Sequence, residues 1–341
     1  MSLDSRSTTH ESRGDAPGRS CPLSYRYAPA SLAREPELVA DTLYVVGGLY
    51  GNGPALASIL DLAAAEMGRA AVVFNGDFNW FNVDAEGFES INRAVLEHVA
   101  LRGNVETELT TNDTAAGCGC GYPDWVSDAE VGHSNVIMER LRDTARAFPE
   151  LRERLGLLPM NLVARVGGAR VAIVHGDAES LAGWGFSQEA LDDPGQLARV
   201  SQWFDEARAD VFASSHTCLP VACELPGERV LVNNGAAGMP NFRATRHGVI
   251  TRISGTRALA TEALYTVYAG DVRVEALPVH YDAARFEREF LVNWPAGSPA
   301  NTSYHTRITR GPNYEADRAI RPHATPIGSS RQHPLRQENP T

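Results

Sequence analysis

The sequence predicts an α/β protein in which helices and strands pack in layers. The chain has 341 residues, of which 43% are apolar and 21% charged, so it can bury a full hydrophobic core. Short apolar runs bounded by Gly, Asn and Asp alternate with longer amphipathic stretches. Polar residues directly follow several of the apolar runs, and layered sheets bind ligands at such strand ends.

The first half of the chain contains two strand-and-helix pairs. A strand over 42–46 leads through a Gly-rich turn into a helix over about 54–67. A second strand over 70–74 ends just before Asp77, and a helix over about 86–99 precedes Asn104. Both polar residues therefore follow a structured segment.

The second half continues the alternation and shows no internal repeat. The predicted elements, in chain order, are a helix (131–154), a hairpin of two strands (162–166 and 171–174), a helix (194–208) and two strands (211–213 and 230–233). The hairpin ends at His175, and the strand over 211–213 is soon followed by His216.

We expect one folded domain between two tails. Residues 1–40 are rich in Ser, Arg, Pro and Gly without sustained periodicity, and 311–341 is rich in Pro, so both are predicted to be disordered. Between them we expect a domain over 41–285 and an extension over 286–310 that packs on it. The aromatic, turn-rich segment 294–304 either lies on the domain surface or contacts a second copy, so a homo-oligomer stays open.

Charge and composition exclude several classes of function. The net charge of −11 disfavours a general nucleic-acid surface, and all 31 basic residues are Arg, which excludes Schiff-base chemistry and a P-loop Lys. The apolar runs are too short for a membrane span, and no signal peptide opens the chain, so we expect a cytoplasmic protein without a membrane partner. The five cysteines form no C-x-x-C pair, so reduced thiols are expected.

Four polar residues at strand ends form a candidate metal site. Asp77, Asn104, His175 and His216 supply one carboxylate, one amide oxygen and two imidazoles. Such a mixed oxygen and nitrogen set suits zinc, manganese or iron. We therefore expect these four side chains to converge and to hold one divalent ion.

Six short blocks around these residues resemble the calcineurin-like metallophosphoesterases, in particular their compact bacterial phosphodiesterase and phosphatase branch. The blocks are GLYGN at 48–52, GD at 76–77, GNVE at 103–106, VHG at 174–176, SHTCLP at 215–220 and NNGA at 233–236. The resemblance covers roughly residues 42–282, and the order and spacing of the blocks make it specific. It implies a four-layer α/β/β/α sandwich.

The departures from the family pattern fall on one metal site. In the family, the second metal takes the positions of Asp77, Asn104, His175 and His216, which all remain. The first metal takes the shared Asp and three further positions, which are changed here: Gly48, Tyr50 and Cys218. The family also has a His beside the Asn, and Val105 stands there, which cannot transfer a proton.

The resemblance implies a metal-dependent phosphoester hydrolase, either a phosphodiesterase or a phosphomonoesterase, that acts on a small phosphorylated substrate through one retained metal site. Asp77, Asn104 and Tyr50 are the expected catalytic residues. Asn52, which matches a turn Asn of the family, and Arg102, which precedes the GNVE block, are the expected substrate-binding residues.

Two alternatives remain. In the first, a second site is rebuilt, with Tyr50 and Cys218 joining Asp77 around a softer or ferric ion. In the second, the chain is a catalytically impaired binding or regulatory protein that keeps the fold and one ion.

Two loops are candidate parts of the same cleft. Cys118 and Cys120 lie on a Gly-rich loop, where they are either further metal ligands or small apolar groups of a tight turn. Asp177, Glu179 and Trp184 follow His175 and either line the cleft or belong to a surface loop.

Overall fold

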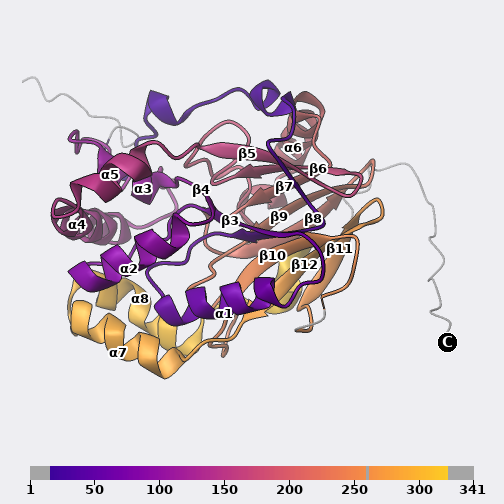
Figure 1. The fold of residues 1–341 in the computed structure, drawn as a ribbon. Helices are drawn as coiled ribbons and strands as arrows, with labels where there is room; N and C mark the ends of the chain where they lie inside the picture. The colour runs from indigo at the N-terminus through magenta and orange to yellow at the C-terminus, as the bar shows by residue number, and fades with distance from the viewer. Residues whose placement is uncertain (1–15, 259–260, 322–341) are drawn as a thin grey trace, which may run out of the picture.

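Two β-sheets pack face to face between helices in the computed structural model, which describes residues 16–258 and 261–321 (Figure 1). The six-stranded sheet has the order β11 (Tyr265–Ala269), β12 (Val272–Val279), β10 (Gly248–Ser254), β2 (Thr42–Val46), β3 (Ala70–Asn75) and β4 (Val99–Leu101). The seven-stranded sheet has the order β1 (Leu38–Ala40), β5 (Asn161–Val166), β6 (Ala169–Val174), β7 (Val211–Ser214), β9 (Arg229–Asn234), β8 (Pro220–Leu225) and β13 (Ile320–Arg321).

The helices lie outside the two sheets, with α1, α2 and α7 below the six-stranded sheet in Figure 1. The α-helices are α1 (Gly53–Ala64), α2 (Ala85–Val95), α3 (Asn104–Thr110), α4 (Asp128–Ala145), α5 (Pro149–Gly156), α6 (Pro194–Ala207), α7 (Ala283–Asn293) and α8 (Pro299–Arg310). Short 3-10 helices are η2 (Leu23–Tyr25), η3 (Pro29–Ala33), η4 (Ala190–Asp192) and η5 (Ala316–Ala319).

Alternation along the strands divides the core into layers. In β2, Tyr44 and Val46 pack among the helices α1, α2, α7 and α8, whereas Leu43 and Val45 pack between the two sheets. Strands β6, β7 and β9 bury their other face against α6, where Phe212 contacts Phe204. Successive strand side chains point to opposite faces, so each sheet separates two apolar layers. The predicted four-layer α/β/β/α sandwich is confirmed.

Local sequence signals explain where the helices begin. Asn52 accepts a hydrogen bond from the backbone of Ala55 at the start of α1, and Asp84 does the same for Gly87 in α2. Ser127 opens α4 with a capping box. The predicted helix over 131–154 is two helices, because Pro149 begins α5 after the non-helical Phe148 and cannot continue α4.

The folded part of the chain extends further toward both ends than predicted. Tyr25 and Leu32 are buried against the domain, and β1 pairs in parallel with β5, so residues 16–40 belong to the fold. Tyr314 is buried against Phe242, which ties residues 311–321 to the fold as well. The rest of both predicted tails, 1–15 and 322–341, lies outside the described residues. Within the described part of the chain, no helix is long and apolar enough to span a membrane.

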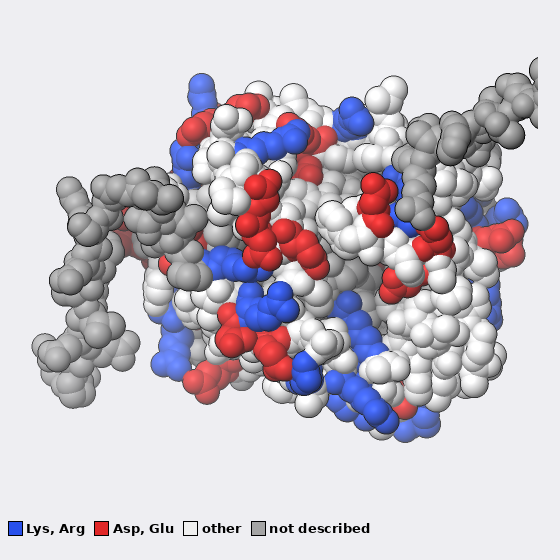
Figure 2. All heavy atoms as spheres, turned by 180° about the vertical axis from the view of Figure 1, so that it is seen from behind, with Lys and Arg blue, Asp and Glu red and all other residues white. Residues whose placement is uncertain are grey.

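Parallel strands bring the functional loops to one end of the molecule. Strands β2, β3 and β4 run parallel in one sheet, and β6, β7 and β9 run parallel in the other. The loops that follow them therefore gather at a shared edge, as expected for ligand sites in layered sheets. On the face shown in Figure 2, acidic and basic side chains are interspersed over the surface.

Candidate metal centre

Tight turns at the ends of the strands place the candidate ligands. Gly76 has φ +79° and Asp77 has φ +54°, so the chain turns sharply after β3. A Cβ on Gly76 would lie 2.5 Å from the Gly103 nitrogen and 2.7 Å from His175 Nδ1. Only glycine fits there, because three segments of the chain meet at this point.

The structure brings the four expected ligands together. His175 Nε2 lies 3.4 Å from Asp77 Oδ2, 3.3 Å from Asn104 Oδ1 and 3.2 Å from His216 Nδ1. All four side chains are almost completely buried. Ligands of a single ion, at bond lengths of about 2.0–2.2 Å and angles of about 90–109°, stand roughly 2.8–3.6 Å apart. The observed spacing matches that range.

The atoms that face away from the cluster are hydrogen-bonded to the backbone. His175 Nδ1 lies 2.7 Å from the Asn75 carbonyl, and His216 Nε2 lies 2.9 Å from the Cys120 carbonyl. Because a carbonyl only accepts, each imidazole donates there, and in its neutral form it presents a lone pair to the cluster.

The amide of Asn104 is oriented in the same way. Asn104 Nδ2 donates to the Cys118 carbonyl at 3.0 Å, so Oδ1 turns towards the other ligands. When both imidazoles are neutral, four acceptor atoms meet with no donor hydrogen between them, an arrangement that a bound cation satisfies. The donor set therefore fits a divalent ion of the zinc, manganese or iron type.

The ionisation of these groups also favours a cation. Burial and the nearby His175 lower the pKa of His216 to about 4, so its imidazole is neutral at pH 7. Burial raises the pKa of Asp77, but the adjacent His175 outweighs burial and keeps it below its ordinary value. Burial lowers the pKa of His175, but Asp77 raises it above its ordinary value. The buried carboxylate thus favours a positive charge at His175 Nε2, which a proton supplies in the metal-free site and a divalent ion would supply in its place.

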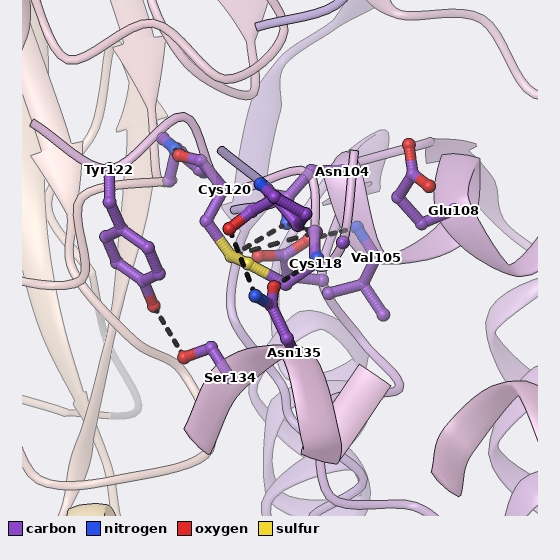
Figure 3. Close-up of a disulfide and its surroundings, with 12 residues drawn as sticks. Asn104, Val105, Glu108, Cys118, Cys120, Tyr122, Ser134 and Asn135 are labelled. Atoms are coloured by element: carbon purple, nitrogen blue, oxygen red, sulfur yellow. Dashed lines mark hydrogen bonds between the residues drawn. A yellow bond between two sulfur atoms is a disulfide. The ribbon is translucent and has the colours of Figure 1, made fainter. Parts of the chain in front are cut away.

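A disulfide-closed loop supports two of the ligands (Figure 3). Cys118 and Cys120 are bonded to each other, with 5.4 Å between their Cα atoms, so the expectation of reduced thiols is wrong for this pair. The loop acts through its carbonyls, because Cys118 accepts from Asn104 and Cys120 accepts from His216. Asn135 of α4 fixes the loop by accepting from the Cys118 backbone.

The altered half of the site is filled by protein atoms. A Cβ on Gly48 would lie 2.9 Å from both Cζ and the hydroxyl oxygen of Tyr50, so the phenol occupies the space of a side chain at position 48. The Tyr50 hydroxyl lies 2.9 Å from Cys218 Sγ, and this thiol lies 3.2 Å from the His216 carbonyl. Burial raises the pKa of Tyr50 and that of Cys218, so both stay protonated at pH 7.

The residues after Asn104 have structural partners. Val105 is buried, and its backbone donates to Asp77 Oδ1 at 3.2 Å. The Glu106 carboxylate accepts from the backbone nitrogens of Asp77, Phe78 and Gly103 and so fixes the two ligand loops to each other. Burial and the charge of Asp77 raise the pKa of Glu106 to about 7.

The two expected substrate-binding residues do not line the cavity beside the cluster. Asn52 is fully buried, and its amide caps α1 and donates to the Gly238 carbonyl at 2.7 Å. Arg102 donates to the Gly156 carbonyl at 3.3 Å. Their contacts with substrate stay predictions, and the geometry does not favour them.

Of the loop after His175, only Trp184 reaches the cavity. Asp177 accepts from the backbone nitrogens of Glu179, Ser180 and Gly185, and so it shapes the loop. Glu179 pairs with Arg199 at the surface.

A cavity of about 390 Å³ opens beside the cluster. Its lining includes the ligands Asp77, Asn104 and His216 together with residues that sequence reasoning did not assign to a site. Among these further residues are Trp80, Tyr122, Trp125, Tyr304 and Arg307. For Tyr304, the only signal was the aromatic composition of the segment 294–304. Nothing in the sequence pattern singled out Arg307.

Comparisons with known proteins agree with the fold. No protein-family model matches the chain, and no curated protein matches it. A hypothetical protein from Pyrococcus horikoshii aligns over 81% of this chain and 100% of its own, with TM-score 0.53 and 16% identity. A metallophosphoesterase from Sphaerobacter thermophilus aligns over 80% of this chain and 100% of its own, with TM-score 0.51 and 15% identity. Together with the topology, this likeness shows that the chain has a metallophosphoesterase-like fold.

Proposed function

We propose that the chain is a phosphoester hydrolase that works with a single divalent ion held by Asp77, Asn104, His175 and His216. The observation that carries the proposal is the convergence of four ligand side chains, each held by a hydrogen bond to the backbone. When bound, such an ion polarises a phosphoryl oxygen and lowers the pKa of water. The ligand set carries one negative charge, so the loaded site is positive and attracts an oxyanion.

The protein contributes orientation and a partly closed cavity. His175 and His216 hold their nitrogens toward the ion because Asn75 and Cys120 accept their other N–H groups. Preorganised groups of this kind need no rearrangement during the reaction. Tyr50 lines the cavity beside Asp77, so its phenol is placed to contact the phosphoryl group.

A single ion accounts for the altered half better than a rebuilt second site. Tyr50 fills the space over Gly48, and its hydroxyl is engaged with Cys218. A second cation would have to replace that hydrogen bond and to deprotonate two groups whose burial opposes it. The alternative of a binding or regulatory protein gains support from Val105, because no proton donor stands at that position.

Turnover of phosphoesters tests the proposal. The chain should hydrolyse phosphomonoesters or phosphodiesters when manganese, zinc or iron is added, and Asp77→Asn should reduce kcat at least 100-fold. Asp61→Asn, on an exposed position of α1, is the matched control and should leave turnover unchanged. A chain that binds the ion but hydrolyses no phosphoester would instead be a binding protein.

A further inference from the structure

The cavity beside the cluster is unusually aromatic. Six of its eighteen lining residues are aromatic, whereas aromatic residues make up 8% of the chain. Three of the five tryptophans in the sequence are among them: Trp80, Trp125 and Trp184. An aromatic lining of this kind recognises flat, apolar groups through ring contacts.

Three rings form an aromatic wall next to a metal ligand: Tyr122, Trp125 and Trp184. The ring centroids of Trp184 and His216 are 5.5 Å apart, and Trp184 lies 5.8 Å from Tyr122 and 6.2 Å from Trp125. Trp184 Nε1 donates to the Cys120 carbonyl at 3.0 Å, which fixes the ring. Trp125 is 60% exposed, so packing of the core does not explain it.

The lining of the same cavity also includes one guanidinium group, that of Arg307. Arg307 of α8 donates through Nη2 to the Cys218 carbonyl at 2.6 Å and through Nε to the Pro240 carbonyl at 3.0 Å. Among the described residues it has no carboxylate partner and its Nη1 has no hydrogen-bond partner. Glu130, also in the lining, is engaged with Ser127. Arg307 is therefore a fixed cation near the altered half of the site, suited to a phosphoryl oxygen.

The missing acid restricts the leaving group. Hydrolysis joins a water oxygen to phosphorus and breaks the bond from phosphorus to the ester oxygen, which departs with the electron pair. Val105 cannot protonate that oxygen. A phenol-type group, with a pKa near about 10 like that of Tyr, leaves as the anion and takes its proton from water. An ordinary alkoxide is a far poorer leaving group.

We propose that the substrates are aryl phosphoesters, in which a flat aromatic ring is attached directly to the ester oxygen. The ring lies on the aromatic wall, and Arg307 binds the phosphoryl group beside the ion. The inference rests on the proposed function and names its substrate class.

Binding without turnover is the first test. Phenylphosphonate and methylphosphonate differ by the ring and cannot be hydrolysed, so calorimetric titration of the metal-loaded protein compares them directly. Phenylphosphonate should bind roughly 2- to 10-fold more tightly, the range of one aromatic contact. Trp125→Ala, at an exposed position, should remove that difference, whereas Tyr268→Ala, also at an exposed position, should retain it. Equal binding of the two phosphonates by the wild type would overturn the inference.

Turnover supplies the second test. Aryl esters are intrinsically reactive, so the quantity to compare is the ratio of kcat/KM for phenyl phosphate to that for butyl phosphate. This ratio should fall several-fold in Trp125→Ala, and Arg307→Gln should lower kcat/KM for both esters at least 10-fold. Arg310→Gln, also on α8, is the control and should have no effect. Equal kcat/KM values for the two esters, with no effect of Trp125→Ala on their ratio, would refute the inference about the substrate class but not the proposed hydrolase function. No turnover of these monoesters or of the corresponding diesters by the metal-loaded chain refutes the proposed function itself.

Discussion

Replacing Tyr50 with Phe separates a one-metal site from a rebuilt two-metal site. The change removes only the hydroxyl that lies 2.9 Å from Cys218 Sγ. The thiol keeps the His216 carbonyl as its own acceptor at 3.2 Å, so no buried donor is left unpaired. Tyr50→Phe should therefore fold, bind one ion per chain as the wild type does, and lose one hydrogen bond.

The expected loss of stability follows from that single bond. A net hydrogen bond contributes about 0.5–1.5 kcal/mol, which corresponds to a fall in Tm of roughly 1–2 °C for a domain of this size. Tyr265→Phe is a matched control, because Tyr265 is buried and its hydroxyl finds no hydrogen-bond partner among the described residues. Removal of an unpaired buried hydroxyl should be neutral or stabilising.

Thermal unfolding followed by circular dichroism measures the change in Tm. Metal analysis of the same samples measures the number of ions per chain. A loss of one of two metal equivalents in Tyr50→Phe would show that the phenol is a ligand and would refute the one-metal reasoning. Equal Tm values for Tyr50→Phe and Tyr265→Phe would show instead that the bond to Cys218 contributes nothing.

Three further changes test the support of the site. Gly76→Ala should lower the free energy of unfolding by about 1–3 kcal/mol and reduce bound metal, because the new Cβ clashes at φ +79°, as denaturation and metal analysis would detect. Arg142→Leu leaves the buried Glu108 carboxylate without its partner at 2.6 Å and should cost about 3–5 kcal/mol in denaturant unfolding. The double change Cys118→Ala and Cys120→Ala should weaken metal affinity roughly 10-fold in a competition titration, because their loop orients two ligands.

Each of these changes has a distinguishing outcome. Gly132→Ala, at an open position in α4, is the control for Gly76→Ala and should stabilise the protein slightly. If Gly76→Ala were equally harmless, the three segments would not meet as described. Unchanged metal affinity after loss of both cysteines would mean that the loop does not position Asn104 and His216.

Much of the site could be predicted from the sequence because its ligands stand next to strong local signals. Asp77 follows β3 through a Gly, His175 directly follows β6, and His216 lies two residues after β7, and parallel strands bring such ends together. Asn104 also follows a Gly, although β4 before it was not predicted as a strand. The helices were predicted where apolar periodicity and caps agree, as in α6. Strands β8 and β10–β12 were not predicted, because their burial depends on the packing of two sheets rather than on a local pattern.

Long-range contacts explain what the sequence could not reveal about the cavity. Arg307 reaches Cys218 from a helix 89 residues further along the chain. Trp184, in the loop after β6, contacts Trp125, which lies shortly before α4, although 59 residues separate them in the sequence. Cys118 and Cys120 lack a spacing that specifies a pair, so only the folded backbone shows that they are bonded.

Metal content per chain tests the central claim most directly. Protein purified without a metal-affinity step would be analysed by plasma mass spectrometry, beside His175→Ala and Cys218→Ala. The single-site account predicts about one equivalent in the wild type and in Cys218→Ala, and close to none in His175→Ala. Two equivalents in the wild type, or one equivalent that survives in His175→Ala, would contradict it.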